Sequence, residues 1–129
     1  MSSRAIVESF WAAMQDNDWS RAAGHLTEDC WIDWPCSGER IVGRDDFVAL
    51  QARYPTNSGR WNFDVHRIVV EDNVTVSEVT VDDGEQGARV VAFSILEGSH
   101  IAHQIEYWPM PYEPRPGREG LTQPIPTIP

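Results

Sequence analysis

The chain has 129 residues, 41% of them hydrophobic and 10% aromatic, which is enough for one domain with a real core but too little for two. Its formal net charge of -10 argues against a nucleic-acid or anionic-membrane partner, because both surfaces would repel it. All ten basic residues are arginine, so a lysine Schiff base is excluded as a catalytic device.

Cys30 and Cys36 are the only cysteines, and their spacing is not that of a metal site or a disulfide framework. We expect two reduced thiols in a cytoplasmic protein. The N-terminal residues lack the pattern of a signal peptide, and no stretch is apolar enough to span a membrane. We therefore expect no membrane partner.

Apolar residues at helical spacing predict an amphipathic helix over residues 3–16. Asn17 and Asp18 interrupt this pattern. Asp18 or Ser20 can cap a second, short helix, which is predicted to run through Leu26.

Residues 30–34 have the composition of a strand, which Pro35 and the turn-forming residues after it bring to an end. A third helix is predicted over residues 44–54, because its apolar residues share one side. Pro55 prevents that helix from continuing.

The remaining periodicity is that of strands. Four segments rich in β-branched and aromatic residues are separated by short, turn-like connections: 61–70, 73–81, 88–96 and 101–108. Short connections favour sequential antiparallel pairing. Helices followed by a meander predict an α+β fold, with the sheet packed against three N-terminal helices.

Residues 109–129 contain seven of the nine prolines and cannot form a regular helix or strand. We therefore predict a domain over residues 1–108 and a proline-rich tail over 109–129. The tail either wraps the domain or a partner subunit, or is disordered.

Three stretches carry a resemblance to a known family. They are the Asn-Asp-Trp turn with HLTEDCWIDWP after it, SGERIVGRDDFVAL, and EGSHIAHQIEYW, which is a glycine-containing turn followed by the last predicted strand. Their order resembles the nuclear transport factor 2-like superfamily, and within it the SnoaL-like polyketide cyclases. The resemblance covers about residues 3–108. It implies a cone-shaped, barrel-like curved antiparallel sheet around a small-molecule pocket, and a homodimer that buries an apolar sheet face.

Two chemistries of that superfamily fit poorly. In the register of the ketosteroid isomerases, Trp34 occupies the position of the carboxylate base and Phe10 that of the tyrosine, while Val91 or Ala92 replaces the sheet aspartate. A slip of one residue would bring in Asp33, but it would also turn that side chain to the other face.

The epoxide hydrolases related to limonene epoxide hydrolase need an Arg-x-Asp motif on a central strand. Glu78 and Thr80 stand at those two positions here, so the charges of that site are lost.

The SnoaL-type cyclases place an acidic general acid/base on the last strand, and the resemblance puts Glu106 at that position. Strand alternation places Ala102, Gln104, Glu106 and Trp108 on one face. A carboxylate among tryptophans is poorly solvated, which raises its pKa toward the range useful for proton transfer. Asp33 is a second candidate, either as a base or as an acceptor for the turn that follows it.

We expect no cofactor and no metal, since His66, His100 and His103 cannot converge with Glu106. The sequence thus predicts a SnoaL-like enzyme performing cofactor-independent acid/base chemistry (cyclisation, isomerisation or dehydration) on an apolar cyclic or aromatic molecule. The alternative is a non-catalytic binding or assembly domain of the same fold. Glu106 and Asp33 are the predicted catalytic residues, and the predicted substrate-binding residues are Phe10, Trp11, Trp34, Tyr54, His66, Glu78, Gln104 and Trp108. For Glu78 a surface position is the other interpretation.

Overall fold

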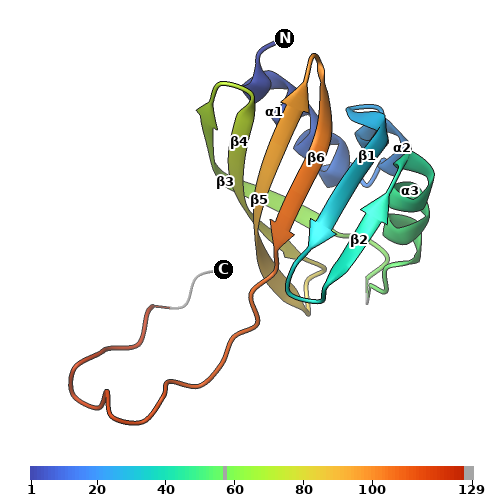
Figure 1. Cartoon of the computed structure of the whole chain (residues 1–129). Helices are drawn as coiled ribbons and strands as arrows, with labels where there is room; N and C mark the ends of the chain where they lie inside the picture. The colour runs from blue at the N-terminus through green and yellow to red at the C-terminus, as the bar shows by residue number, and fades with distance from the viewer. Residues whose placement is uncertain (57, 127–129) are drawn as a thin grey trace.

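The computed structural model describes residues 1–56 and 58–126 (Figure 1). The helices are α1 (Ser3–Gln15), α2 (Trp19–Ala23) and α3 (Arg44–Arg53). The strands are β1 (Leu26–Trp34), β2 (Glu39–Val42), β3 (Asn62–Glu71), β4 (Val74–Asp82), β5 (Gly87–Glu97) and β6 (His100–Tyr107). The predicted α+β fold is confirmed.

Helix α1 begins at a serine cap, where the Ser2 hydroxyl accepts a hydrogen bond from the amide of Ala5 over 3.1 Å. Its apolar stripe is buried against the sheet, as the helical spacing predicts. The buried side chains of α1 are Ile6, Val7, Phe10, Trp11, Ala13 and Met14. All three helices lie on one face of the sheet, which leaves the other face bare (Figure 1).

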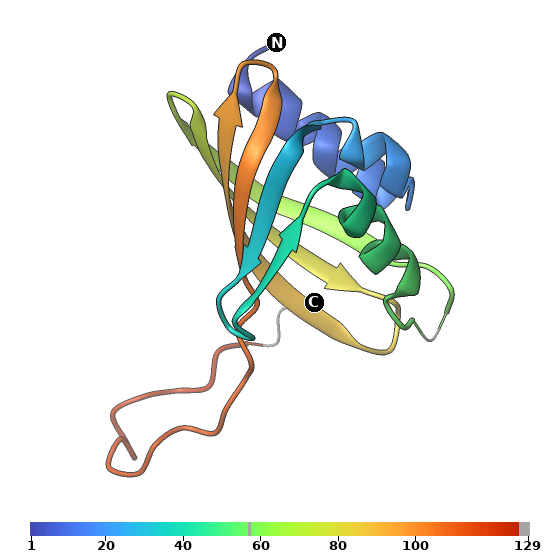
Figure 2. The same ribbon diagram turned by 45° about the vertical axis from the view of Figure 1, so that its right-hand side comes forward.

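The strand order is β2-β1-β6-β5-β4-β3. Every neighbouring pair is antiparallel except β1 and β6, which run parallel. The prediction of an antiparallel sheet is therefore wrong at this pair, because the long connection between β1 and β6 lets the last strand return beside the first in the same direction. The sheet curves around the helices without closing, since its edge strands β2 and β3 do not meet (Figure 2).

Two element boundaries also differ from the predictions. Leu26 begins β1 and pairs with Ile101, whereas the sequence placed it at the end of the second helix, which stops before Gly24. Strand β2 was not predicted, because it has only four residues and lies between two turns. Its residue Ile41 is buried and pairs with Ile32, which gives this short segment its place in the sheet.

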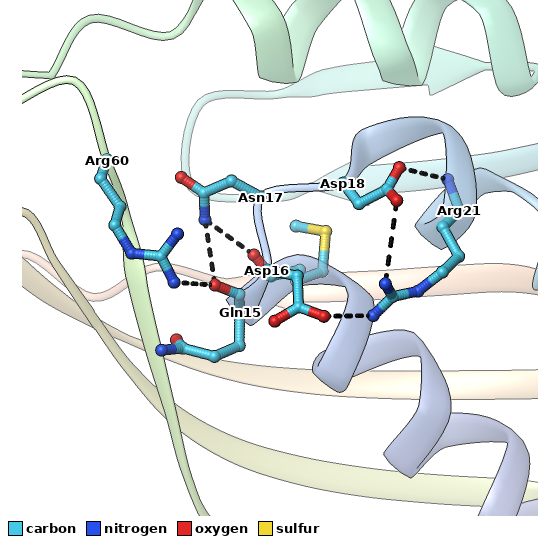
Figure 3. A network of polar contacts seen from close by, with 7 residues as sticks. Gln15, Asp16, Asn17, Asp18, Arg21 and Arg60 are labelled. Carbon is cyan, nitrogen blue, oxygen red and sulfur yellow. Dashed lines mark hydrogen bonds and ion pairs between the residues drawn. The ribbon is translucent and has the colours of Figure 1, made fainter.

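The junction of α1 and α2 is tied to the start of β3 by polar contacts around Asn17 (Figure 3). The Asn17 amide donates to the carbonyls of Met14 and Trp61 over 2.9 and 2.7 Å, and its oxygen accepts from the Trp61 amide over 2.9 Å. The carbonyl of Gln15 accepts a hydrogen bond from Arg60. Asn17 has a φ of 54°, a conformation that asparagine tolerates better than most residues. These contacts fix the position of Trp61, the residue directly before β3.

The tail leaves the body after β6 and extends away from it (Figure 1). Its described residues, 109–126, contain no helix or strand, and all of them are exposed. No helix in the described part of the chain is long and apolar enough to cross a membrane.

Candidate functional site

A cavity of about 390 Å³ lies between α1, α3 and the inner face of the sheet. Its wall is mainly aromatic, and the aromatic side chains come from α1, from the residue after α3, from β1, from β3 and the residue before it, and from the residue after β6. They are Trp11, Trp34, Tyr54, Trp61, Phe63 and Trp108. Such rigid rings suit a flat apolar molecule.

Glu106 is the buried acid of this cavity, with only 7% of its surface exposed. Three N–H groups donate to its carboxyl group. Trp34 Nε1 and Trp108 Nε1 donate to Oε1 over 2.8 and 3.3 Å, and Gln104 Nε2 donates to Oε2 over 2.6 Å. No arginine is among the hydrogen-bonding partners found for it in the described residues.

Burial raises the pKa of Glu106, because a charged carboxylate is poorly solvated inside the protein. The hydrogen bonds from Trp34, Gln104 and Trp108 oppose this shift, since they stabilise the ionised form. The net direction is upward, which makes Glu106 a better proton donor near neutral pH than an exposed glutamate.

Gln104 lies behind Glu106 and is completely buried. Its amide oxygen accepts a hydrogen bond from Ser94 Oγ over 2.7 Å, so Ser94, Gln104 and Glu106 form one polar line across β5 and β6. The amide can rotate by 180°, because a serine hydroxyl both donates and accepts. After that rotation the amide oxygen of Gln104 accepts a hydrogen bond from the O–H of the protonated carboxyl group. The line therefore accommodates both protonation states of Glu106.

A bulge determines which residues of β6 face the cavity. Pairing between β5 and β6 shifts at the start of the strand, and Ile101, Gln104 and Glu106 are the buried residues. The predicted alternation thus holds for Gln104 and Glu106 but not for Ala102, because the bulge inserts an extra residue before His103.

Trp61 brings an unused hydrogen-bond donor to the cavity wall. Its Nε1 is buried and has no hydrogen-bond partner among the described residues. In contrast, Trp11 Nε1 donates to Ser77 Oγ over 3.0 Å, and the indoles of Trp34 and Trp108 are engaged by Glu106. Protein atoms cover this N–H, so a ligand oxygen would satisfy it only once the indole ring turns toward the cavity.

Asp33 lies on the opposite face of β1, outside the cavity. Arg40 Nε donates to it over 2.6 Å, and His103 Nε2 lies 3.2 Å from its other oxygen. These contacts, that with Arg40 foremost, lower the pKa of Asp33. The structure does not bring Asp33 together with Glu106, because the neighbouring Trp34 takes the inward position on β1.

Two predicted substrate-binding residues also lie on the outer face. Glu78 forms ion pairs with Arg67 and Arg89 at 3.1 and 3.4 Å. His66 is exposed and contacts Thr80 Oγ1 over 2.5 Å. Neither lines the cavity, since alternation on β4 turns Ser77 and Val79 inward instead.

Phe10 is buried in the core, where its ring packs against those of Trp11 and Phe47 at centroid distances of 5.1 and 6.1 Å. It supports the cavity wall from behind. The other predicted residues, Trp11, Trp34, Tyr54 and Trp108, line the cavity with Glu106, and Gln104 is bonded to that acid.

Sequence reasoning missed several residues of the wall. Trp61 and Phe63 alternate along β3, and Met14 lies one helical turn after Trp11, so periodicity could have found all three. Glu39 and Cys36 lie at the exposed margin, beside the turn between β1 and β2. They carry no pattern that marks a site.

No cluster of three or more His, Cys, Asp or Glu side chains within residues 1–56 and 58–126 is arranged to hold a metal ion. Both cysteines are free thiols, Cys30 buried and Cys36 exposed.

The family model described as a SnoaL-like domain matches residues 7–104 of the chain. This stretch runs from α1 into β6 and includes most of the cavity wall. No curated protein matches the chain at a significant level.

Solved structures share the whole architecture. A candidate ketosteroid isomerase from Kribbella flavida is 27% identical, with a TM-score of 0.88, over 97% of this chain and 90% of its own. An NTF-2-like protein of unknown function from Burkholderia xenovorans is also 27% identical, with a TM-score of 0.78, over 96% of this chain and 95% of its own. A candidate SnoaL-like polyketide cyclase from Shewanella denitrificans, only 9% identical, shares the fold with a TM-score of 0.70 over 83% and 90%.

Proposed function

Since the chain belongs to the SnoaL-like domain family, we propose that it is an enzyme that performs cofactor-independent acid/base chemistry on an apolar cyclic or aromatic substrate. The reaction would be a cyclisation, isomerisation or dehydration. The observation that carries this proposal is the burial of Glu106 among three N–H donors in an aromatic cavity. Glu106 lies just beyond the stretch that the family model matches, so its proposed role depends on this geometry.

In this proposal Glu106 transfers a proton to or from the substrate, and burial raises its pKa above that of an exposed glutamate, toward the range useful for proton transfer. Ser94 and Gln104 adjust by the amide rotation described above, so the carboxyl group keeps its position in both states. Once its indole ring turns toward the cavity, Trp61 would donate its free N–H to a carbonyl or hydroxyl oxygen of the substrate. The preferred substrate is therefore a flat ring system that carries an oxygen.

The second candidate function is that of a non-catalytic binding module. Its supporting observation is that Asp33 does not converge with Glu106, so the cavity has a single buried carboxyl group. A binding protein would use the same aromatic wall and the Trp61 donor without proton transfer.

We also propose a homodimer that buries the bare face of the sheet, and a cytoplasmic location. Both remain predictions of the sequence and the fold.

Proton transfer can be tested before the natural substrate is known. Cyclic aromatic ketones such as 1-tetralone and 2-tetralone are incubated with the protein in D₂O, and exchange of the hydrogens next to the carbonyl is followed by mass spectrometry. Binding is measured separately, by the loss of thiol reactivity at the exposed Cys36 at the cavity margin, because Cys30 is buried.

We expect exchange that falls by about 10²-fold or more in Glu106→Gln, the usual scale for general acid/base catalysis, while binding is retained. Asp33→Asn is the matched control and should retain both. Binding without exchange in the unmodified protein would favour the binding module. Full exchange in Glu106→Gln would exclude Glu106 as the proton-transfer group.

A further inference from the structure

The outer face of the sheet, on the side away from the helices, carries apolar side chains on all six strands. The strand registers place Val69, Val76, Phe93 and Ile105 in one row, and Val91 and Tyr107 pair in the next. Trp31 and Val42 continue this surface over β1 and β2. No element of the body covers it (Figure 1), and Val69 and Val42 are each 58% exposed. An apolar surface of this kind marks an interaction site.

Several charges on the outer face are paired, although Asp64 and Glu71, which the strand registers place on the same face, have no ion pair among the described residues. Asp33 is bonded to Arg40, and Glu78 is bonded to both Arg67 and Arg89. Two copies could therefore approach through the part of this face that holds these ion pairs without facing unpaired carboxylates there, whereas like charges brought together elsewhere would repel.

The tail, residues 109–126 of the described chain, has the properties of a docking segment. Four large apolar side chains on it are 78–84% exposed: Met110, Tyr112, Leu121 and Ile125. It has two arginines and two glutamates, so the entire net charge of -10 lies on residues 1–108. Its backbone bends at a turn where the Leu121 amide donates to the Arg118 carbonyl over 3.0 Å. Beyond Met110, which lines the cavity, the tail thus presents apolar, neutral surface away from its own body.

The matches to two solved structures extend into this tail. The body up to Trp108 is 108 of 129 residues, or about 84% of the chain, so a match confined to the body cannot exceed that share. The Kribbella and Burkholderia structures match 97% and 96%, and therefore include most of the tail, whereas the Shewanella structure matches 83%. The matched tail residues are therefore ordered in both crystal structures, and contacts must hold them, because ordering an exposed chain costs conformational entropy.

We propose that the tail is an arm that packs onto a second copy of this chain, at the margin of two outer sheet faces that meet in the dimer. The arm's own body leaves its apolar side chains exposed, so the contacts that fix it come from the partner. This inference depends on the homodimer proposed above and adds to it that each subunit clasps the other.

The first test compares the dissociation constant of the dimer in the full chain with that in a chain that ends after Trp108, by analytical ultracentrifugation. We expect the truncation to weaken the dimer at least about 100-fold, since a few buried apolar side chains dominate most interfaces. A second variant, Tyr112→Ser with Leu121→Ser and Ile125→Ser, should reproduce the loss. Its control, Glu113→Gln with Thr122→Ser and Gln123→Asn, should not. Circular dichroism checks that each variant is folded.

The second test uses trypsin, which cleaves after arginine unless proline follows. Arg115 precedes Pro116, so Arg118 is the single cleavable bond of the tail. We expect cleavage at Arg118 to be slow above the dissociation constant of the dimer and fast below it.

The outcomes separate the two proposals. A full chain that is monomeric at about 100 µM, well above the affinity of most stable interfaces, overturns the homodimer and the arm together. A truncated chain that dimerises as tightly as the full chain overturns the arm alone. A cleavage rate at Arg118 that does not vary with protein concentration also overturns the arm. A constantly fast rate would indicate a free tail, and a constantly slow rate would indicate a tail packed on its own body.

Discussion

Trp34 Nε1 lies 2.8 Å from Oε1 of Glu106, although 72 positions separate the two residues. The parallel pairing of β1 with β6 brings them together, because Asp33 pairs with Ile105 and the next residue of each strand turns inward. The one parallel pair in the sheet therefore builds the centre of the candidate site.

This hydrogen bond predicts a shift that mutation can measure. Trp34→Phe removes an N–H that stabilises the ionised carboxylate, so the pKa of Glu106 should rise further. Trp108→Phe removes a longer bond of 3.3 Å and should have a smaller effect. The intensity of the protonated carboxyl band in infrared difference spectra, followed against pH, compares the two variants. Equal shifts, or a downward shift in Trp34→Phe, would contradict the assigned roles.

Glu106→Gln should change how stability depends on pH. The folded pKa of Glu106 is raised above its unfolded value. Its contribution to stability is therefore present in acid, below the unfolded pKa, and is lost as the pH rises through the folded pKa. The variant lacks this loss, so it should gain stability relative to the parent as the pH rises from the unfolded pKa, about 4.3, through the folded pKa. The gain should be about 1.4 kcal/mol for each pH unit by which the folded pKa exceeds the unfolded one.

Urea midpoints measured across that pH range test this prediction. Glu39→Gln, at the exposed margin of the cavity, is the matched control and should follow the parent curve. Parallel curves for Glu106→Gln and the parent would contradict it.

Gln104→Met should destabilise the fold by about 1–3 kcal/mol, because it leaves Ser94 and Glu106 without their buried partner. Glutamine and methionine side chains have similar volume, so the loss of stability measures the broken hydrogen bonds to Ser94 and Glu106 rather than a cavity. Gln123→Met on the exposed tail is the control and should leave the free energy of unfolding unchanged. Chemical denaturation of both variants decides the point.

Asn17 allows its backbone conformation and its amide contacts to be separated. Asn17→Ala loses the bonds to Met14 and Trp61 and keeps a φ of 54° without the polar side chain that lets asparagine tolerate it, so it should cost about 2 kcal/mol or more. Asn17→Gly accepts that φ but still loses the bonds, and should cost less. Thermal unfolding that ranks glycine below alanine would show that the positive φ contributes nothing.

Much of the architecture could be predicted from periodicity. The apolar spacing of α1 and the alternation along β3 to β6 are local signals, and they place Glu106 and Gln104 on one face. The same rule, applied to β1, gives Asp33 and Trp34 opposite faces, so only one of them can face the cavity. The resemblance-based register favoured Trp34 there, and the structure agrees.

The remaining features depend on contacts between distant parts of the chain. Neither the parallel pairing of β1 with β6 nor the short strand β2 has a local pattern, because each is stabilised by a partner strand. The bulge that removes Ala102 from the inner face is likewise a property of the pairing with β5. The free N–H of Trp61 depends on which acceptors surround it in the folded protein.

The most direct test of Glu106 as a buried proton-transfer group is a measurement of its pKa. Carbon-13 NMR of glutamate and aspartate side-chain carboxyl groups follows each titration, and Glu106→Gln assigns the signal. We expect a titration midpoint for Glu106 above that of an exposed glutamate, which is about 4.3. Asp33 should titrate below about 3.9, because Arg40 stabilises its ionised form. A Glu106 midpoint at or below that of the exposed glutamates would contradict a buried proton-transfer group in this cavity.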